Sequence, residues 1–310
     1  MPPALLPPDT TPSLKTKTDD PWTVLKTITW SREYLQGKGV SEPRLSSELL
    51  LGSVLGLDRL ALFLQFDRPL NPAELAGFKA LLLRRAHNEP VAYILGRKEF
   101  WSLSFAVNPS VLIPRPETEL LVEEALALIQ SDPSLKNTIE LGTGSGAIII
   151  SLAKTLLSTP VEPRFMAATD RSWPALKTAE ANARQHQVRQ AVSFLQGNWL
   201  IPFTPRRKIN LVISNPPYLT PEEIRQLAPG IKKYEPLYAL DGGPDGLTAI
   251  RELLGQARRI IQPGGWVLLE IGETQGPPVL QLARQNGFDP VMIRPDYAGK
   301  DRVLKGQLNG

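Results

Sequence analysis

The sequence predicts an α/β fold with a mostly parallel seven-stranded sheet whose last strand is antiparallel, preceded by a small all-helical domain. From residue 138 onward, short β-branched apolar runs alternate with helical patterns, which is typical of a sheet covered by helices on both faces. A glycine-rich turn follows the first of these runs. Before residue 90 the apolar residues recur at helical spacing instead, which indicates a separate helical domain.

Amino-acid composition narrows the chemistry open to this chain. Its 310 residues, 42% hydrophobic and 21% charged, suit a globular protein of about two domains. It has no cysteine and only two histidines, His87 and His186, which lie far apart in the sequence. These counts exclude thiolate and multi-histidine metal sites and cysteine nucleophiles, and they argue against a serine–histidine triad. We therefore expect chemistry without a metal, carried by carboxylates, amides, backbone groups or a bound cofactor.

The charge and hydropathy of the sequence indicate which partners and which cellular compartment to expect for the protein. The net charge of +4 is mildly basic, and a solvated loop is the better explanation of its densest basic cluster, Arg206 to Lys208. No apolar stretch approaches the roughly 18–20 residues that span a bilayer. The N-terminus lacks the basic segment of a secretory signal. We expect a cytoplasmic monomer with no stable nucleic-acid partner and no membrane partner.

The first ninety residues divide into two parts. Residues 1–20 are rich in Pro, Thr, Lys and Asp, which predicts a flexible leader. In residues 21–90, Pro and Gly fall between the helical runs, which predicts a small helical bundle. We expect Ser41 to cap the second helix and Asn71, which precedes Pro72, to cap the last one.

The rest of the chain begins with a connecting segment. Residues 91–113 show an aromatic and β-branched alternation that predicts a β-hairpin linker, and a helix over Pro116–Ile129 follows.

In residues 114–310 we expect strands at Thr138–Leu141, Phe165–Asp170, Val192–Gln196, Ile209–Ser214, Trp266–Ile271, Pro290–Ile293 and Arg302–Leu304. We expect helices at Ala147–Leu157, Ala175–His186, Leu247–Ile261 and Gly276–Asn286. The last two strands should pair antiparallel, because their connection is too short for a crossover helix.

A glycine-rich turn (ELGTGSG, residues 140–146) links the first strand of the sheet to a helix. The carboxyl end of a strand is the usual ligand crevice of open α/β sheets, and small residues there allow close approach to the backbone. Gly142, Gly144 and Ala147 also satisfy the dinucleotide fingerprint G-x-G-x-x-G/A, and a bare packing turn is a further alternative. The turn by itself therefore leaves the ligand open.

Two carboxylates near the turn help to choose between cofactors. Asp170 ends the second strand, where it can accept both hydroxyls of a ribose, although it could instead cap the following helix. Glu140 precedes the glycines, where its charge would attract a ligand with sulfonium and ammonium groups and repel a pyrophosphate. The turn contains no basic residue. These features favour S-adenosylmethionine (SAM) over NAD as the cofactor.

The fourth strand ends in Asn215-Pro216-Pro217-Tyr218. The two prolines fix backbone φ and lack N–H groups, so the carbonyl groups here point in set directions. The Asn215 side-chain carbonyl and the Pro216 backbone carbonyl can accept both hydrogens of a planar NH2 group, and Tyr218 offers a face for that group. The pattern predicts methylation of an amide or exocyclic amine nitrogen, with a proline-stiffened turn as the alternative.

Several segments resemble one enzyme family. They are PVAYILGRKEFW, VLIPRPETELLVEE, ELGTGSGAIIISLA, SNPPYL, YEPLYALDGGPDGL and DYAGKDRVL. They are similar to the protein-(glutamine-N5) methyltransferases that modify peptide chain release factors, the PrmC or HemK family, over nearly all of the chain after about residue 22. The resemblance implies a SAM-dependent methyltransferase (Rossmann-like) domain over residues 114–310. It also implies methyl transfer from SAM, leaving S-adenosyl-L-homocysteine, to the side-chain N5 of the glutamine in the GGQ motif of class I release factors.

The resemblance implies roles for individual residues. The cofactor site would consist of Glu140, Gly142, Thr143, Gly144, Ser145, Gly146, Asp170, Asn198, Trp199 and Asn215. Asn215, Pro216, Pro217 and Tyr218 would bind the glutamine, with Asn215, Pro216 and Tyr218 as the catalytic residues. The helical domain would dock the release factor, and residues 219–243, with Glu235, would line the substrate entrance. Interdomain packing is the alternative for Glu235 and for residues 114–119.

The sequence departs from the family pattern at two positions: Glu140 stands where aspartate is common, and Asn198 where an acid often precedes the aromatic residue. The competing functions are an amino-group methyltransferase acting on nucleic acid or a ribosomal protein, and a SAM-binding regulator without turnover. A nucleic-acid enzyme would need a basic channel, which the mild charge does not indicate. A regulator would not need two aligned carbonyl acceptors.

Overall fold

The computed structural model describes residues 21–159, 165–203 and 209–309, and the chain divides into two compact units after His87. The predicted leader, residues 1–20, and the basic cluster at residues 206–208 lie outside the described residues. Each unit has its own apolar core and is described by itself.

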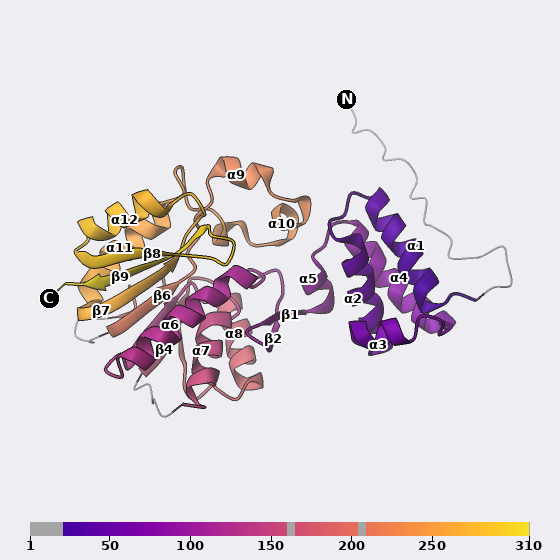
Figure 1. The fold of residues 1–310 in the computed structure, drawn as a ribbon, viewed down its shortest axis with the longest axis horizontal. Coiled ribbons are helices and arrows are strands. Elements are labelled where there is room, and N and C mark those ends of the chain that lie inside the picture. Colours follow the sequence, from indigo (N-terminus) through magenta and orange to yellow (C-terminus); the bar gives the residue numbers. More distant parts are fainter. Residues whose placement is uncertain (1–20, 160–164, 204–208, 310) are drawn as a thin grey trace. The chain divides into compact units, whose positions relative to one another are not determined.

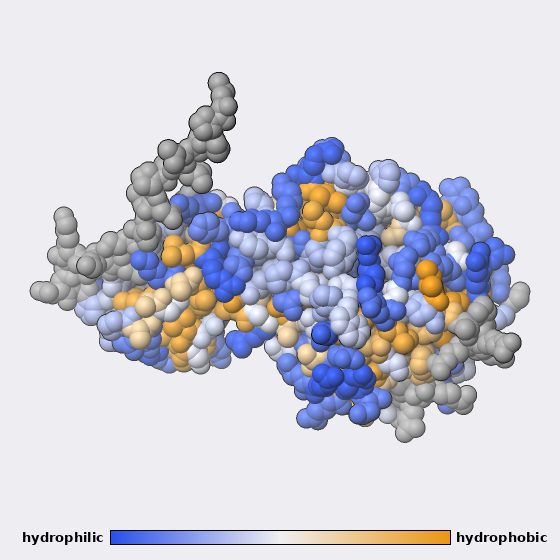
Figure 2. All heavy atoms as spheres, turned by 180° about the vertical axis from the view of Figure 1, so that it is seen from behind, coloured by the Kyte–Doolittle hydropathy of each residue, from blue (hydrophilic) through white to orange (hydrophobic). Residues whose placement is uncertain are grey.

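The N-terminal unit is a helical bundle, as the sequence predicts (Figure 1). Its helices in the described residues are α1 (Val24–Gly37), α2 (Pro43–Leu55), α3 (Arg59–Leu64) and α4 (Pro72–Ala86). Its buried core includes Val24, Ile28, Leu35, Leu50, Leu51, Leu62, Phe78 and Leu82. Figure 2 shows hydrophobic side chains, in orange, on the surface of this unit, and α3 exposes Leu60, Phe63 and Leu64.

The helix caps of this unit agree with the sequence prediction at Asn71 and differ from it at Ser41. The Asn71 side chain accepts the Glu74 N–H at 2.9 Å, and the Glu74 carboxylate accepts the Asn71 N–H at 2.9 Å, which completes a capping box on α4. The prediction for Ser41 was wrong. Because Pro43 takes the first helical position of α2, the cap position falls on Glu42, whose backbone is left-handed at φ 49°.

The C-terminal unit is built on the predicted seven-stranded sheet. Its strands are β3 (Asn137–Leu141), β4 (Phe165–Asp170), β5 (Ser193–Gln196), β6 (Ile209–Ser214), β7 (Ile261–Glu270), β8 (Phe288–Pro295) and β9 (Asp301–Leu308). They lie in the order β5-β4-β3-β6-β7-β9-β8. The pairs from β5 to β7 are parallel, and β9 is antiparallel to both β7 and β8, which confirms the predicted antiparallel last strand.

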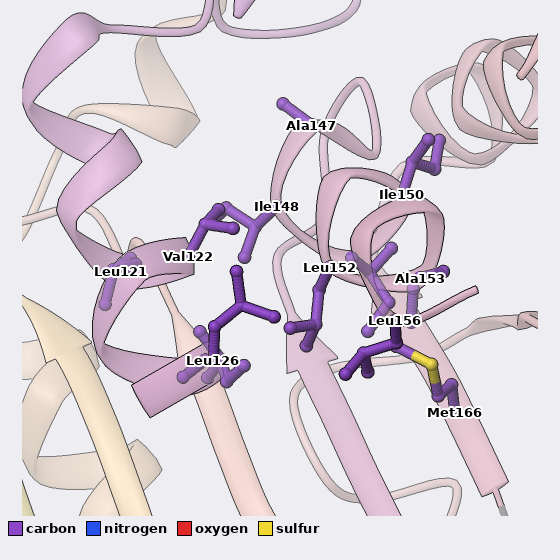
Figure 3. Packing of buried hydrophobic residues seen from close by; sticks show 14 of the residues in the cluster. Leu121, Val122, Leu126, Ala147, Ile148, Ile150, Leu152, Ala153, Leu156 and Met166 are labelled. Atoms are coloured by element: carbon purple, nitrogen blue, oxygen red, sulfur yellow. The ribbon is translucent and has the colours of Figure 1, made fainter. Parts of the chain in front are cut away.

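Helices cover both faces of this sheet (Figure 1). One face carries α6 (Glu119–Ser131), α7 (Ala147–Leu156) and α8 (Trp173–Gln185), and the other carries α11 (Thr248–Ile260) and α12 (Gly276–Gln285). The side chains of β6 alternate between the two layers: Leu211 and Ile213 join the core under α6 and α7, and Val212 joins the core under α11. Figure 3 shows Val122 of α6 facing Ile148 of α7 in the first of these cores.

Element boundaries differ from the sequence prediction in a few places. The hairpin consists of β1 (Arg97–Phe100) and β2 (Leu103–Ala106), and a short helix not predicted from the sequence, α5 (Val91–Leu95), precedes it and ends at Gly96 in the left-handed region. The predicted helix after the hairpin begins as a 3-10 turn, η1 (Pro116–Thr118), before α6.

The fifth strand of the sheet starts earlier than predicted. β7 begins at Ile261 rather than Trp266, and a register shift against β6 accommodates Pro263 and the two glycines that follow it. Between β6 and α11 the chain forms α9 (Pro221–Gln226), α10 (Pro229–Tyr234) and a 3-10 turn, η2 (Leu237–Ala239). No helix within the described residues is long and apolar enough to cross a membrane.

Candidate active site

A cavity of about 360 Å³ lies at the carboxyl ends of the parallel strands of the C-terminal unit. Four successive strands contribute to its wall, since parallel strands end at the same edge of the sheet. The residues contributed are Glu140, Gly142, Thr143, Gly144 and Ser145 from β3 and its turn, Asp170 and Arg171 from β4, Gly197, Asn198 and Trp199 after β5, and Asn215 and Pro217 after β6. The remaining wall comes from Ala147 and Ile148 of α7, Ala175 of α8, and parts of residues 110–118 and 236–252.

The glycine turn brings its backbone to the edge of this cavity. Gly142, Gly144 and Gly146 all have positive φ, at 68°, 55° and 82°. A Cβ on Gly146 would lie 2.6 Å from the Ile150 side chain and 3.2 Å from Ala179 Cβ, so both its conformation and its packing require glycine. Gly146 does not line the cavity but allows the turn to enter α7 directly.

Glu140 is a buried carboxylate at the base of the turn. It is 1% exposed and accepts the Thr143 hydroxyl at 2.6 Å and the Ile149 N–H at 3.2 Å. Burial, with a smaller contribution from the charge of Asp170, raises the pKa of Glu140 to about 8. A cation bound beside Glu140 would favour its ionised form.

Asp170 holds the turn against the end of β4. Its two carboxylate oxygens accept the N–H groups of Gly144 at 2.9 Å and Ser172 at 2.8 Å. Burial raises the pKa of Asp170, although these hydrogen bonds favour its ionised form. The alternative that Asp170 caps α8 was wrong, because Ser172 is the cap residue and accepts the Ala175 N–H. Each oxygen of Asp170 retains a lone pair for a ligand hydroxyl.

Asn198 and Trp199 are joined by a residue that the sequence analysis missed. Glu252 of α11 accepts the Asn198 amide N–H and the Trp199 indole N–H, both at 3.2 Å, and it also lines the cavity. The Trp199 ring lies 3.5 Å from the position of a Cβ on Gly142, so the indole packs against the turn. No local sequence signal marks Glu252, which lies more than fifty positions away from its partners.

Asn215 lies on the cavity wall, and a hydrogen bond orients its side-chain amide. Its Nδ2 donates to Thr118 Oγ1 at 3.1 Å, and no described residue donates to its Oδ1. Pro216 is buried, and no described residue donates to its carbonyl oxygen. Two acceptors next to each other in the chain are therefore left without a partner from the described residues, one of them on a cavity-lining residue.

Tyr218, unlike Asn215, does not line the cavity. Its hydroxyl donates to Oε1 of the buried Glu270 at 3.2 Å. Burial and the charge of Glu270 raise the pKa of Tyr218. Pro217, by contrast, lies on the cavity wall.

Glu235 also lies behind the wall rather than on it. It is 4% exposed, accepts the Ile113 N–H at 3.1 Å and forms an ion pair with Arg115 at 2.6 Å. Arg115 does line the cavity, so Glu235 is connected to the cavity wall through this guanidinium. Glu235 and residues 114–119 all belong to the C-terminal unit, where these contacts form.

The residues after Glu235 contribute to the cavity wall. Tyr238 lines the cavity, and its hydroxyl donates to the Ser110 carbonyl at 3.1 Å. The Arg171 guanidinium lies 5.4 Å from the centre of the Tyr238 ring. Ser110, Arg171 and Tyr238 thus connect three separate segments of the cavity wall.

The charged residues of the cavity wall are mostly acidic. Glu140, Asp170, Asp241 and Glu252 contribute carboxylates, and Arg115 and Arg171 contribute guanidinium groups. Within the part of the chain that the structure describes, no group of three or more His, Cys, Asp or Glu side chains is placed to hold a metal ion. The wall therefore suits a ligand with positive charge.

Comparisons with known proteins agree with this arrangement. Residues 26–96 match the PrmC N-terminal domain family, and residues 117–228 match the methyltransferase small domain family. In fold alone, the chain is similar to the hMettl16 catalytic domain solved with a MAT2A 3'UTR hairpin, with a TM-score of 0.54 and 17% identity over 74% of this chain and 81% of that chain.

Full-length relatives extend the match to nearly the whole chain. The release factor glutamine methyltransferase of Geobacter sulfurreducens is 42% identical over 93% of this chain and 97% of its own length. Those of Moorella thermoacetica and Vibrio cholerae are 43% and 40% identical over 87% and 89% of this chain, and 93% of each relative. Identity at this level over both units means that the chain belongs to the release factor glutamine methyltransferase family.

Proposed function

We propose that this protein transfers a methyl group from SAM to the side-chain N5 of the glutamine in the GGQ motif of class I release factors. The observation that carries the proposal is a pair of acceptors, Asn215 Oδ1 and the Pro216 carbonyl, that have no hydrogen-bond donor among the described residues and lie beside a cavity built on a glycine turn. A primary amide presents two N–H donors in one plane, which matches two neighbouring acceptors.

The residues of the cavity fit SAM as the cofactor. Glu140 and the other carboxylates favour a cation and would repel a pyrophosphate, which argues against a dinucleotide. Asp170 offers lone pairs to ribose hydroxyls, and Trp199 offers a flat apolar wall. When bound, SAM supplies an electrophilic methyl group on sulfur and leaves as S-adenosyl-L-homocysteine.

Asn215 and Pro216 would both bind and activate the glutamine. An amide nitrogen is a poor nucleophile because its lone pair is delocalised, and the roughly 18–20 kcal/mol barrier to rotation about a peptide C–N bond measures that resonance. Two accepted hydrogen bonds move electron density back onto the nitrogen and fix its plane. Holding the nitrogen in line with the methyl group contributes up to roughly 7–11 kcal/mol through positioning. The nitrogen exchanges one of its two protons for the methyl group, and that proton is released.

The two units would divide the work between protein recognition and chemistry. We assign docking of the release factor to the helical unit, where α3 exposes Leu60, Phe63 and Leu64 at 67%, 61% and 74%. Residues 236–243, which line the cavity in part, would face the incoming loop. We further propose that the enzyme acts as a cytoplasmic monomer and forms no stable complex with nucleic acid or membranes.

The experiment that tests this function supplies methyl-labelled SAM and a purified class I release factor to the enzyme. We expect label in one glutamine, located by mass spectrometry, and none in a release factor whose GGQ glutamine is replaced by alanine. Parallel reactions contain ribosomal RNA, DNA or ribosomal proteins as acceptors. Strong transfer to any of these with none to the release factor would overturn the proposal in favour of the competing amino-group methyltransferase.

A further inference from the structure

A buried carboxylate outside the cavity is linked to the Asn215 side chain. Glu270, the last residue of β7, is 1% exposed and does not line the cavity. Its Oε2 accepts the Thr118 hydroxyl at 2.7 Å, and its Oε1 accepts the Tyr218 hydroxyl at 3.2 Å. Thr118 Oγ1 in turn accepts the Asn215 Nδ2–H at 3.1 Å. Neither Thr118 nor Glu270 is among the site residues predicted from the sequence.

The direction of this chain of hydrogen bonds follows from counting protons. An ionised carboxylate only accepts, so the single hydroxyl proton of Thr118 is directed to Glu270. Thr118 Oγ1 is then an acceptor toward Asn215, and only the NH2 end of the Asn215 amide can satisfy it. The Oδ1 end is left free, which is the end that a substrate NH2 group requires.

We propose that Thr118 and Glu270 are positioning residues for methyl transfer, which fix the Asn215 amide with its oxygen toward the substrate. The inference rests on the proposed function, because it explains how one acceptor of that site is oriented. With the amide rotated by half a turn, Asn215 would present N–H groups to the N–H groups of the glutamine, and the two donors would repel each other.

The charge state of Glu270 affects the orientation of the Asn215 amide through the same chain of hydrogen bonds. A protonated Glu270 can donate to Thr118, whose proton would then turn toward Asn215 and favour the wrong end of its amide. The titratable and charged groups around Glu270 are Tyr218, Glu117 and Arg302. Burial raises the pKa of Glu270, against the opposing effect of Arg302. Methyl transfer should therefore increase as the pH rises through this pKa.

The test measures kcat at saturating SAM for four variants in the release factor assay across a range of pH, because the affinity for SAM is itself expected to change with pH through Glu140. We expect Thr118→Val, which removes both the donor and the acceptor, to lower kcat by about 10- to 100-fold, the cost of misplacing a reacting partner. Thr118→Ser keeps the hydroxyl and should restore kcat. Glu270→Gln resembles the protonated carboxyl, because it offers one acceptor and one donor where the carboxylate offers two acceptors. It cannot titrate in this range, so it should lower kcat at every pH and lose the acidic limb of the wild-type pH profile.

A matched control is Glu124→Gln, which neutralises another buried carboxylate of the same unit, ion-paired with Arg294 and Lys305 away from the cavity. It should keep both kcat and the acidic limb. Equal kcat for Thr118→Val and wild type, or an acidic limb that persists in Glu270→Gln, would overturn the inference. If Thr118→Val fails to fold, the Glu270→Gln profile still decides. Wild-type enzyme that transfers nothing to release factor would instead reject the proposed function.

Discussion

Glu235 and Arg115 form an ion pair at 2.6 Å across 120 positions of sequence, with the carboxylate buried and the guanidinium on the cavity wall. The same carboxylate accepts the N–H of the buried Ile113. The pair therefore ties the segment before η1 to the end of α10 and fixes one side of the cavity.

The first prediction concerns this pair. Glu235→Ala should lower the free energy of unfolding by about 1–3 kcal/mol, because it leaves the buried Ile113 N–H without an acceptor. Glu235→Gln retains that acceptor and should be closer to wild type in stability, but it releases Arg115 and so should lower kcat/KM for methyl transfer. Urea denaturation and the methylation assay measure the two effects. Equal stability of the two variants would contradict this account.

Removal of the Asn215 amide should abolish most of the turnover. We expect Asn215→Ala to lower kcat by about 100-fold or more, by analogy with the loss of a single preorganised hydrogen bond in other active sites. SAM binding, measured by calorimetry, should weaken only modestly, because the turn and Asp170 remain. Asn286→Ala is the matched control, since the Asn286 amide bonds only its own helix at the end of α12 among the described residues. Undiminished turnover in Asn215→Ala would reject the mechanism.

SAM affinity should depend on pH through Glu140. The pKa of Glu140 is about 8 in the folded protein, and a bound cation favours the ionised form, so binding below that pH releases a proton. The dissociation constant should fall by up to about tenfold per pH unit as the pH rises toward 8. The ligand amine also titrates near pH 8, at about 7.7–8.0. Glu140→Gln shares that titration, so the difference between the two profiles isolates Glu140, and identical profiles would contradict the prediction.

The same shift predicts how the stability of the unliganded protein changes with pH. Between the ordinary carboxyl pKa of 4.5 and about 8, the folded state holds a proton on Glu140 that the unfolded state has lost. Stability from this residue therefore falls as the pH rises through that window, opposite to the change in SAM affinity.

Glu252 should affect SAM binding more than the rate of methyl transfer. Glu252→Ala removes the acceptor shared by Asn198 and Trp199, and we expect the dissociation constant of SAM to rise by about tenfold, the worth of one hydrogen bond. The effect should appear in KM for SAM rather than in kcat. Glu180→Ala, which removes a carboxylate of α8 that does not line the cavity, should leave SAM binding unchanged. Equal weakening in both variants would point to a general loss of fold.

The capping box of α4 gives a prediction for stability alone. Asn71→Ala should lower the free energy of unfolding by about 0.5–2 kcal/mol, because the Glu74 N–H loses its acceptor. Asn71→Ser keeps an oxygen in reach and should recover most of the loss. Chemical denaturation followed by circular dichroism measures both, and an unchanged transition in Asn71→Ala would contradict the assignment.

Features that depend on neighbours in the chain were predictable from the sequence. Asn71 before Pro72 marks a helix start, the glycine turn marks a strand passing into a helix, and residues 215–218 mark a rigid carbonyl array. These signals are local, because caps, turns and proline constraints act within a few residues. At the start of α2 two local signals competed, Ser41 as a cap residue and Pro43 as the first helical residue. The proline took the first helical position, which placed the cap at Glu42.

The sequence by itself determined the two domains, the order of strands along the chain and the residues of the glycine turn and of the Asn215 motif. Only the tertiary structure decided that Glu252 joins Asn198 and Trp199, and that Thr118 and Glu270 orient the Asn215 amide. These contacts span between 53 and 152 positions of sequence. They exist because parallel strands and η1 bring distant side chains to one edge of the sheet, where hydrogen-bond direction depends on which donors and acceptors meet.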